Sequence, residues 1–562
     1  MIEKNITSLQ DMLLKSANYY SDKLALKDLK DTPIKMVTYS ELLDQVLRFG
    51  TALQNLGIKE RTPIAIISEN RVQWGIAYLT CAVFNYIVVP IDNHLHENEV
   101  INILHESNAN VIVYNQHWSD TLNNIDLPLK NLSHFINMDI LEDSDSDLSM
   151  VKLINNTRAV AVEQLPTINP NELFELIFTS GSIGQAKGVM LSHSNLCENL
   201  MSMVRALPIY PTDRFLSMLP IHHTYECTCG FLCPIYSGAS VHYSRSFKYL
   251  LEDIASEQPT LILGVPLIFD KIFKRIWKTI KENKFKDIVV NKLITFTNLL
   301  QKIGLNDLKK YLFKQIHDKF GGHIRVLIVG GAAPDPEVIK GFNDFGLTMV
   351  QGYGLTETAP IVALNRLENP NPLSAGQPLD CCAIKIENPD SEGIGEICVK
   401  GGNVMLGYYK NEELTKDVIK NGWFYTGDLG YLDENNFLYI KGRKKNVIIA
   451  KNGKNVFPEE IEDLLNKNEF ILESVVYGEK DEKEGEIIVA QIVPDTEMFI
   501  KFSDENNLQL NEKIIYDKIS EIVKATNNNL TSYKQIRKFY IRDTEFEKTT
   551  TRKIKRYLIN KK

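Results

Sequence analysis

The chain has 562 residues, of which 44% are hydrophobic and 24% are charged, and its net charge is −8. This composition is typical of a globular protein with large cores, and the length predicts about three or four structural units. The acidic balance argues against nucleic acid as a partner. The N-terminus lacks the apolar run of a secretory signal, and eight unevenly spaced cysteines indicate reduced thiols, so we expect a cytoplasmic protein.

Short apolar, β-branched runs recur between helical stretches in the first 355 residues. They are TPIAIISEN, ANVIVYN, LFELIFTS, PTLILGVP, IRVLIVGG and TMVQGYG. Such runs are typical of strands buried on both faces, in parallel or mixed sheets covered by helices. The apolar stretch 76–91 contains Cys81, Asn85 and Pro90, and predicts a buried helix leading into a strand rather than a membrane span. We therefore predict an α/β body.

The pattern changes towards the C-terminus. From Gly395 to Gly442 apolar and polar residues alternate, with a turn signal at 433–436, which predicts an antiparallel, β-rich section. After Arg443 the pattern predicts a strand, a helix beginning at PEEIEDLL, further strands, and then helices through Lys562. We place a boundary between an N-terminal domain, 1–442, and a small α+β C-terminal cap, 443–562.

Residues 271–320 are strongly basic, with thirteen Lys or Arg against four Asp or Glu. Apolar residues at helical spacing predict a basic amphipathic helix, followed by more helices. These are Ile272, Phe273, Ile276, Trp277 and Ile280. One interpretation is a solvated helical face, and the sharper one is a peripheral contact of 271–320 with an anionic membrane surface.

Cys227, Cys229 and Cys233 lie beside His222 and His223, which raises the question of a zinc site. Neither the spacing nor the single cluster matches a four-ligand site with a second ligand pair further along the chain. We favour buried thiols that pack as small hydrophobic groups.

The strongest local motif is the segment 179–188, between the apolar run LFELIF and a helical stretch from His193. Its candidate binding residues are Thr179, Ser180, Gly181, Ser182, Gly184 and Lys187. Glycines expose backbone N–H groups, hydroxyls add donors and lysine adds positive charge, so we predict a strand–loop–helix site for polyphosphate. The common nucleotide loop would need Gly at 186 and Ser or Thr at 188, and neither is present. The alternative is a flexible Gly/Ser loop.

A second motif, 351–358, also follows an apolar strand. Tyr353, between Gly352 and Gly354, offers a flat ring for a purine. Thr356 and Glu357 offer a hydroxyl and a carboxylate for a phosphate and its magnesium ion.

A third motif is YTGD at 425–428. The carboxylate of Asp428 can accept hydrogen bonds from both hydroxyls of a ribose.

In this order the three motifs resemble those of the adenylate-forming enzymes, the superfamily of AMP-forming acyl-CoA synthetases, luciferases and adenylation domains. The resemblance runs from SDKLALKD near the start to KTTTRKIKR near the end. It implies that the loop 179–188 closes over the ATP phosphates, that Tyr353 stacks on adenine and that Thr356 contacts the α-phosphate. It further implies that Glu357, with Thr179, holds Mg²⁺ and that Asp428 binds ribose.

The resemblance also implies roles for residues outside the three motifs. Gly330, Gly331 and Ala332 would wall the adenine and acyl pockets, and His223 would lie at the carboxylate end of the acyl pocket. In the cap, Arg443 would reach the ribose or phosphate, Lys445 would be the hinge, Gly453 would line the thiol tunnel, and Lys553 would bridge the substrate carboxylate and the α-phosphate.

The sequence departs from the usual pattern of the family at Ile183, Ala186, Asn446 and Arg552. None of these departures removes a reacting group, so we expect an active enzyme.

The expected enzyme uses ATP, Mg²⁺ and coenzyme A to convert a carboxylic acid into acyl-AMP and then a thioester. The basic insert and LPIHHTYE resemble long-chain fatty-acid:CoA ligases more than the small-acid members. A fatty-acyl-AMP ligase or a carrier-protein loading enzyme is the alternative; no carrier domain follows Lys562, which argues against a peptide-synthetase module. A catalytically silent nucleotide sensor is a third reading.

Overall fold

The structure is a computed structural model that describes residues 5–31, 33–123, 131–144, 146–179, 187–301, 308–450, 454–481, 485–549 and 554–559. It divides into two compact units. Unit 1 comprises Met1–Ile384 and Val399–Phe424, and unit 2 comprises Lys385–Cys398 and Tyr425–Lys562. Each unit is described by itself.

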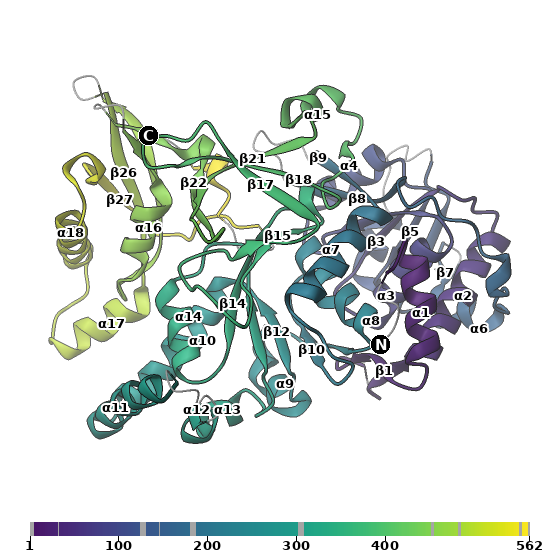
Figure 1. The fold of residues 1–562 in the computed structure, drawn as a ribbon, viewed down its shortest axis with the longest axis horizontal. Coiled ribbons are helices and arrows are strands. Elements are labelled where there is room, and N and C mark those ends of the chain that lie inside the picture. The colour runs from purple at the N-terminus through teal and green to yellow at the C-terminus, as the bar shows by residue number, and fades with distance from the viewer. Residues whose placement is uncertain are drawn as a thin grey trace. The chain divides into compact units, whose positions relative to one another are not determined.

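Unit 1 contains two large sheets (Figure 1). The first has the order β19-β9-β8-β4-β3-β5-β6-β7, and β3 to β6 are parallel. Its strands are β3 (Pro63–Ile67), β4 (Ile87–Ile91), β5 (Val111–Tyr114), β6 (His134–Asn137), β7 (Leu148–Ser149), β8 (Leu173–Thr179), β9 (Lys187–Ser192) and β19 (Gly407–Tyr408).

Helices accompany this sheet and its connections. They are α1 (Leu9–Tyr19), α2 (Tyr39–Asn55), α3 (Val72–Val83), α4 (Glu97–Ser107), α5 (Ser119–Asn123), α6 (Met150–Asn156), α7 (His193–Ala206) and α15 (Glu412–Val418). The start of α2 is set by a capping box, in which Thr38 accepts from the backbone of Glu41 and Glu41 accepts from that of Thr38. Every residue of α3 is buried, as expected for a helix that is apolar all round, and β4 follows it. The prediction for 76–91 is confirmed.

The second sheet of unit 1 has the order β16-β15-β14-β13-β12-β10-β11-β1-β2. From β14 to β1 all neighbours are parallel, so their carboxyl ends meet at one edge. The strands are β1 (Leu24–Asp28), β2 (Lys35–Thr38), β10 (Arg214–Ser217), β11 (Ser240–Tyr243), β12 (Leu261–Gly264), β13 (Val326–Val329), β14 (Met349–Gly354), β15 (Ile361–Leu364) and β16 (Gln377–Pro378).

The helices of this half are the π-helix η3 (Tyr225–Leu232), α8 (Cys233–Ser237), α9 (Leu250–Glu257), α10 (Pro266–Lys281), α11 (Lys284–Gln301), α12 (Leu308–Leu312), α13 (Lys314–Lys319) and α14 (Pro336–Asp344). Cys227, Cys229 and Cys233 are buried thiols on η3 and α8. No helix among the described residues is long and apolar enough to cross a bilayer.

The apolar stripe predicted on α10 is real, but it faces the core. The ring centroid of Phe273 lies 5.5 Å from that of Phe342, and the centroid of Trp277 lies 5.7 Å from that of Phe345. Ile280 is buried in the same cluster. Packing against neighbouring helices therefore accounts for this stripe, whose residues are buried or partly buried.

Unit 2 contains the β-rich section and an α+β portion. A five-stranded sheet has the order β17-β18-β21-β20 with β22 on β21; β17, β18 and β21 cross the unit boundary in sequence, and β20 belongs to unit 1. These strands are β17 (Cys382–Glu387), β18 (Gly395–Gly401), β20 (Ile419–Lys420), β21 (Trp423–Leu432) and β22 (Leu438–Arg443). The remaining elements are β23 (Ile448–Ile449), β24 (Asn455–Val456), α16 (Pro458–Asn466), β25 (Ile471–Asp481), β26 (Gly485–Pro494), α17 (Thr496–Glu505), α18 (Glu512–Asn528) and β27 (Lys538–Ile541).

The fold class predicted from the sequence is confirmed: all six apolar runs are strands, the 433–436 turn joins β21 to β22, and PEEIEDLL begins α16. The expectation of helices through Lys562 is wrong, because β27 follows α18 and pairs with β26. The two compact units do not divide at 442/443, since unit 2 also takes in 385–398 and 425–442. The sequence-based boundary at 442/443 separates the N-terminal domain from a cap, 443–562, that is expected to rotate about a hinge, and this division stays a prediction.

Candidate active site

Three of the predicted site segments follow parallel strands of the nine-stranded sheet, at its carboxyl edge. His223 follows β10, Gly330 follows β13, and Tyr353 is the last residue but one of β14. The strand order β14-β13-β12-β10 makes these strands near neighbours, although their residues are far apart in sequence. The carboxyl edge of a parallel sheet is where ligands bind in open α/β folds. The topology therefore assembles three sequence-predicted segments into one candidate site.

His223 is held by the turn that leads into η3. The backbone N–H of Tyr225 donates to Nδ1 of His223 at 3.2 Å, and the N–H of Cys227 donates to the His223 carbonyl at 2.9 Å. Because Nδ1 accepts, the neutral ring carries its proton on Nε2. His223 is thus prepared to donate from Nε2 to an anionic oxygen.

The adjacent His222 has a different environment. Its Nε2 lies 3.6 Å from Oδ2 of Asp92, which follows β4. Burial lowers the pKa of His222, and the negative charge of Asp92 opposes that shift. The two histidines of LPIHH therefore have different environments, and His222 contacts a residue that follows a strand of the other large sheet.

The backbone after β13 approaches the ring of Tyr225 closely. A Cβ at Gly330 would lie 3.1 Å from Cζ of Tyr225, whose hydroxyl donates to the Ile328 carbonyl at 3.2 Å. Gly331 has a φ of +81°, which favours glycine, and both Gly331 and Ala332 are exposed. Backbone therefore makes up most of the surface at these three residues, and their role as a wall of the adenine and acyl pockets stays a prediction.

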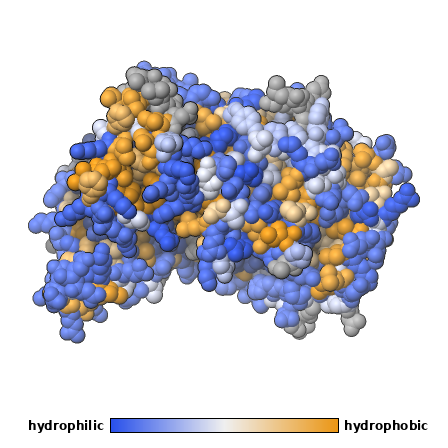
Figure 2. Space-filling view, turned by 90° about the horizontal axis from the view of Figure 1, so that it is seen from below, coloured by the Kyte–Doolittle hydropathy of each residue, from blue (hydrophilic) through white to orange (hydrophobic). Residues whose placement is uncertain are grey.

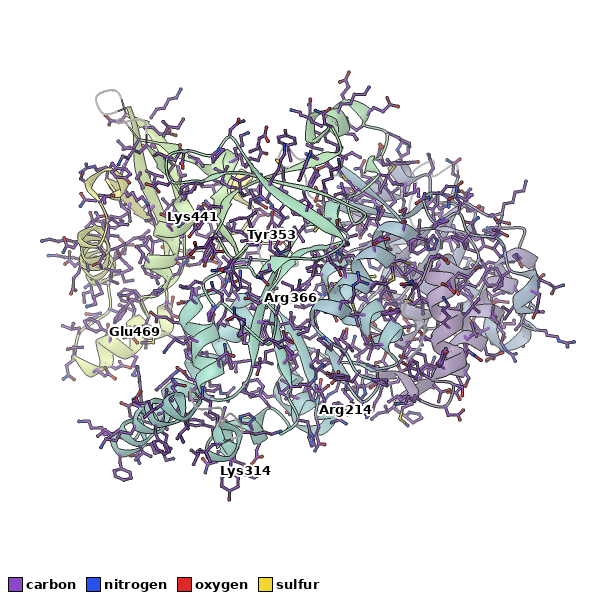
Figure 3. All side chains as sticks on the ribbon, viewed as in Figure 1. Arg214, Lys314, Tyr353, Arg366, Lys441 and Glu469 are labelled. Carbon is purple, nitrogen blue, oxygen red and sulfur yellow. The ribbon has the colours of Figure 1, made fainter. Side chains whose placement is uncertain are left out.

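The end of β14 carries Tyr353, which is labelled in Figure 3. Tyr353 pairs with Ala363 of β15, and Gly352 pairs with Leu364. A Cβ at Gly354 would lie only 2.0 Å from the Pro360 carbonyl oxygen, so no other residue fits there. The ladder and this close approach hold the partly exposed Tyr353 at the carboxyl edge of the sheet.

Thr356 and Glu357 lie on the short helix η5 (Thr356–Thr358) directly after β14. The Glu357 carbonyl accepts from the N–H of Met405 at 2.9 Å. Its side-chain Oε1 accepts from the hydroxyl of Tyr408, also at 2.9 Å. A half-exposed carboxylate oriented in this way is a hard oxygen ligand, so the donor at Glu357 fits Mg²⁺.

Tyr408 also joins Glu357 to Lys187. The ammonium nitrogen of Lys187 lies 5.3 Å from the centroid of the Tyr408 ring, a cation–π distance. The strand β19 pairs with β9 by opposing Tyr408 and Val189, and Tyr409 N–H donates to the Gly188 carbonyl at 2.7 Å. The sequence analysis missed Tyr408, because no local pattern links GYY at 407–409 to motifs so far upstream.

The helix expected from His193 is confirmed as α7, but a strand that was not predicted, β9, lies between it and the loop of the 179–188 motif. Residues 180–186, and with them Ser180, Gly181, Ser182 and Gly184, lie outside the described residues. The flanking strands β8 and β9 form an antiparallel hairpin in which Thr179 opposes Lys187. Helix α7 begins six residues later, and its first turn is capped by Ser192. The dipole of α7 is therefore not at the loop, and Lys187 is the positive charge that the described part of the motif provides.

In unit 2, Asp428 and Arg443 are partners. They oppose each other in the β21–β22 ladder, and Nε of Arg443 lies 2.7 Å from Oδ1 of Asp428. Nη1 of Arg443 also donates to the Thr426 carbonyl at 3.4 Å. The predicted ribose acceptor and the predicted ribose or phosphate contact thus form one ion pair. Arg443 orients the Asp428 carboxylate and offsets its charge.

Three residues predicted in the cap remain to be placed. Lys445 is exposed on the short helix η6 (Lys444–Asn446), whereas Gly453 and Lys553 lie outside the described residues. On either side of 550–553, Lys548 and Ile554 form an antiparallel bridge. Nζ of Lys548 lies 2.7 Å from Glu473 on β25, so the ends of this segment are anchored on the three-stranded sheet.

Comparison with known proteins shows which family the chain belongs to. The AMP-binding enzyme family matches residues 13–409, and the AMP-binding enzyme C-terminal domain matches residues 460–553. The chain is 30% identical over 537 residues to long chain acyl-CoA synthetase 1 of Arabidopsis thaliana, covering 88% of this chain and 80% of the relative. It is 26% identical to long-chain-fatty-acid--CoA ligase 5 of Rattus norvegicus, covering 92% and 80%.

Solved structures share the fold. ATP-bound MatB from Rhodopseudomonas palustris superposes with a TM-score of 0.77 at 21% identity, over 98% of this chain and 97% of that one. A Mycobacterium tuberculosis fatty acyl CoA synthetase superposes with a TM-score of 0.66 at 23% identity, over 98% and 96%. The AMP-binding enzyme family matches most of the chain, and the C-terminal domain of AMP-binding enzymes matches a later part of it. The chain therefore belongs to the AMP-binding enzyme family.

Proposed function

We propose that this protein is an AMP-forming ligase that activates a long-chain fatty acid as its acyl-adenylate and transfers the acyl group to coenzyme A. The observation that carries the proposal is the link from Lys187 through Tyr408 to Glu357, beside Tyr353 at the carboxyl edge of the sheet. A cation, a metal-binding carboxylate and a flat ring in one place suit the phosphates, magnesium ion and purine of ATP.

The first half-reaction brings a carboxylate against the α-phosphorus of a triphosphate, so the main barrier is repulsion between anions. Positive groups placed in advance lower that barrier, as in other phosphoryl chemistry. In the proposed site Lys187 would neutralise phosphate oxygens, Thr356 would donate to the α-phosphate, and Lys553 would bridge the acid and that phosphate. Mg²⁺ held by Glu357 and Thr179 would supply further neutralisation, and pyrophosphate leaves.

In the second half-reaction a thiol attacks the acyl carbonyl and AMP leaves. Asp428, oriented by Arg443, would hold the ribose of the leaving nucleotide through both steps. His223, whose proton is on Nε2, can donate to the acyl oxygen as negative charge develops there. Gly453 would leave room for the thiol. Rotation of the cap about Lys445 would move Lys553 away from the reacting carbon and bring the thiol tunnel to it.

The long-chain substrate is supported by the relatives, several of which are named for long-chain acids. Each buried CH₂ adds about 0.8 kcal/mol of binding, so a long apolar channel would discriminate steeply against short acids. One relative, the long-chain-fatty-acid--[acyl-carrier-protein] ligase AEE15 of Arabidopsis thaliana, is 26% identical over 91% of this chain. Its name supports a carrier protein as the alternative acceptor.

Exchange of labelled pyrophosphate into ATP tests the proposal. Acids of two to eighteen carbons should stimulate exchange increasingly with length, and thioester should then form with coenzyme A rather than with a carrier protein. Lys187→Ala should reduce exchange, whereas Lys416→Ala, on exposed helix α15, should not. Exchange with short acids alone would reject the fatty-acid assignment, thioester only on the carrier would favour the alternative acceptor, and no exchange with any acid would favour the silent sensor.

A further inference from the structure

Helix α11 has apolar side chains on two opposite faces. Its inner face packs into a cluster around Ile280, Phe313 and Phe345. The residues that make this contact are Val290, Leu293 and Ile294. On the same side Thr297 is buried, and the Asn298 amide donates to Asp344 at 2.8 Å. These contacts fix which face of α11 points away from unit 1.

The outer face carries large apolar side chains that no described part of the chain covers. Their exposed fractions are 75% for Phe285, 55% for Ile288, 36% for Val289, 52% for Phe296 and 64% for Leu299. Ile288 and Val289 follow Phe285 by three and four residues, Phe296 follows Val289 by seven and Leu299 follows Phe296 by three, so all five lie on one stripe along the helix. A helix face in water normally carries polar residues, and five exposed apolar side chains along one face indicate a surface that is covered in use.

The surroundings of this stripe are basic. Lys292 lies within the stripe, Lys284 and Lys286 lie at its start, and all three are exposed. The adjacent helix α10 adds four more exposed cations, which are Lys274, Arg275, Lys278 and Lys281. Among the described residues, none of these seven forms an ion pair with a carboxylate. Apolar side chains with unneutralised cations around them match the two layers of an anionic bilayer surface.

We propose that the outer face of α11, with the basic residues of α10 and α11, docks on an anionic phospholipid membrane. The apolar stripe enters the boundary between headgroups and acyl chains, and the lysines remain at the headgroups, where their long stems allow them to reach. This surface lies within the segment 271–320 for which the sequence suggested a membrane contact, but on α11, because the apolar stripe of α10 packs against neighbouring helices.

The charge pattern argues against a second copy of this chain as the occupant. An isologous contact through this face would bring two sets of uncompensated cations together, and like charges at an interface disfavour it. Figure 1 shows α11 at the lower edge of unit 1, beside α12 and α13. Figure 2 looks at this lower side and shows apolar side chains interspersed with polar ones over it.

Flotation of the full-length protein with vesicles tests the proposal. Unmodified protein should float at low salt with vesicles of equal parts phosphatidylglycerol and phosphatidylcholine, and much less with phosphatidylcholine alone. The variant F285S/I288S/F296S/L299S and the variant K284Q/K286Q/K292Q should each bind at least about tenfold more weakly.

Two matched variants control for general loss of apolar or positive surface. Leu141→Ser with Leu373→Ser alters exposed apolar residues elsewhere in unit 1, and K59Q/K400Q/K416Q removes three exposed lysines elsewhere. Both should bind as the unmodified protein does, and all variants should keep the same melting temperature. Absence of flotation, equal binding to uncharged vesicles, or equal loss in the control variants would overturn the proposal. Self-association in sedimentation velocity that the α11 variants abolish, without vesicle binding, would overturn it in favour of a second copy.

Discussion

The hydroxyl of Tyr408 donates a 2.9 Å hydrogen bond to Oε1 of Glu357, while the Tyr408 ring lies against the ammonium of Lys187. One side chain from the end of unit 1 thus orients the proposed metal ligand and the proposed phosphate-binding cation together. Both contacts lie within unit 1, so the arrangement does not depend on the cap.

Tyr408→Phe removes the hydrogen bond and keeps the ring. A hydrogen bond to a charged group contributes about 1.5 kcal/mol or more, so the Mg²⁺ concentration for half-maximal pyrophosphate exchange should rise about tenfold. Tyr408→Leu, which also removes the ring, should additionally raise KM for ATP. Tyr409→Phe is the neighbouring control and should change neither. An unchanged Mg²⁺ dependence in Tyr408→Phe would show that the hydroxyl does not orient a metal ligand.

Lys553→Ala separates the two half-reactions. If Lys553 neutralises charge only while the acid attacks ATP, the variant should lose acid-dependent exchange by roughly 100-fold or more. Supplied with ready-made acyl-adenylate, it should still form thioester. Lys555→Ala, two residues away, should leave exchange near normal. Equal losses in both half-reactions would mean that Lys553 has been misassigned.

Lys445→Pro tests the hinge. Proline restricts φ to roughly −65° and should hold the cap in one orientation. We expect adenylation to persist while thioester formation falls by orders of magnitude, because the second step needs a rotation that hinge residues absorb. Lys445→Ala keeps the torsions free and should have a mild effect. Indistinguishable thioester rates in the two variants would rule out a hinge at this residue.

Glu226 predicts an unusual pH dependence of stability. Burial raises the pKa of this carboxyl to about 8, from an ordinary value of 4.5. A folded pKa above the unfolded one means that the stabilisation is present below pH 4.5 and is lost as the pH rises towards 8. Glu226→Gln stays neutral, so it should be more stable than the unmodified protein by about 2 kcal/mol or more at pH 8.5 and similar to it at pH 4.5.

Thermal unfolding at the two pH values measures this difference. Glu163→Gln, on an exposed segment, is the control and should not change the pH dependence. A Glu226→Gln variant with the same fall in melting temperature between pH 4.5 and pH 8.5 as the unmodified protein would show that Glu226 is ionised at little cost.

Much of the fold was predictable because its strands are buried on both faces and therefore read as continuous apolar runs. The helix expected from His193 is α7, but strand β9 before it was not predicted, because KGVMLS is short and its apolar residues suit a strand or a helix turn alike. The α10 stripe was correctly predicted as a helix face, but periodicity does not say whether the core or the solvent lies beside it. Only the packing of Phe273 and Trp277 settles that question.

The candidate site was predictable where its chemistry is local, as in the run that contains Tyr353, Thr356 and Glu357. The pairing of Asp428 with Arg443 and the bridge made by Tyr408 were not predictable, because both depend on strand register between distant segments. A sequence motif shows which groups are present, whereas register decides which of them neutralise one another.

The pairing of β19 with β9 has a consequence for biosynthesis. β9 leaves the ribosome more than 200 residues before Gly407 and Tyr408, and β19 is among the last parts of unit 1 to be made. Until then the emerging chain has the proposed metal-binding carboxylate of Glu357 and the proposed phosphate-binding cation of Lys187, but lacks the side chain that contacts both. A polypeptide that stops before residue 405 would lack β19 and with it Tyr408. We expect such a product to gain no protection from ATP against proteolysis, so that cells clear it rather than accumulate a half-active ligase.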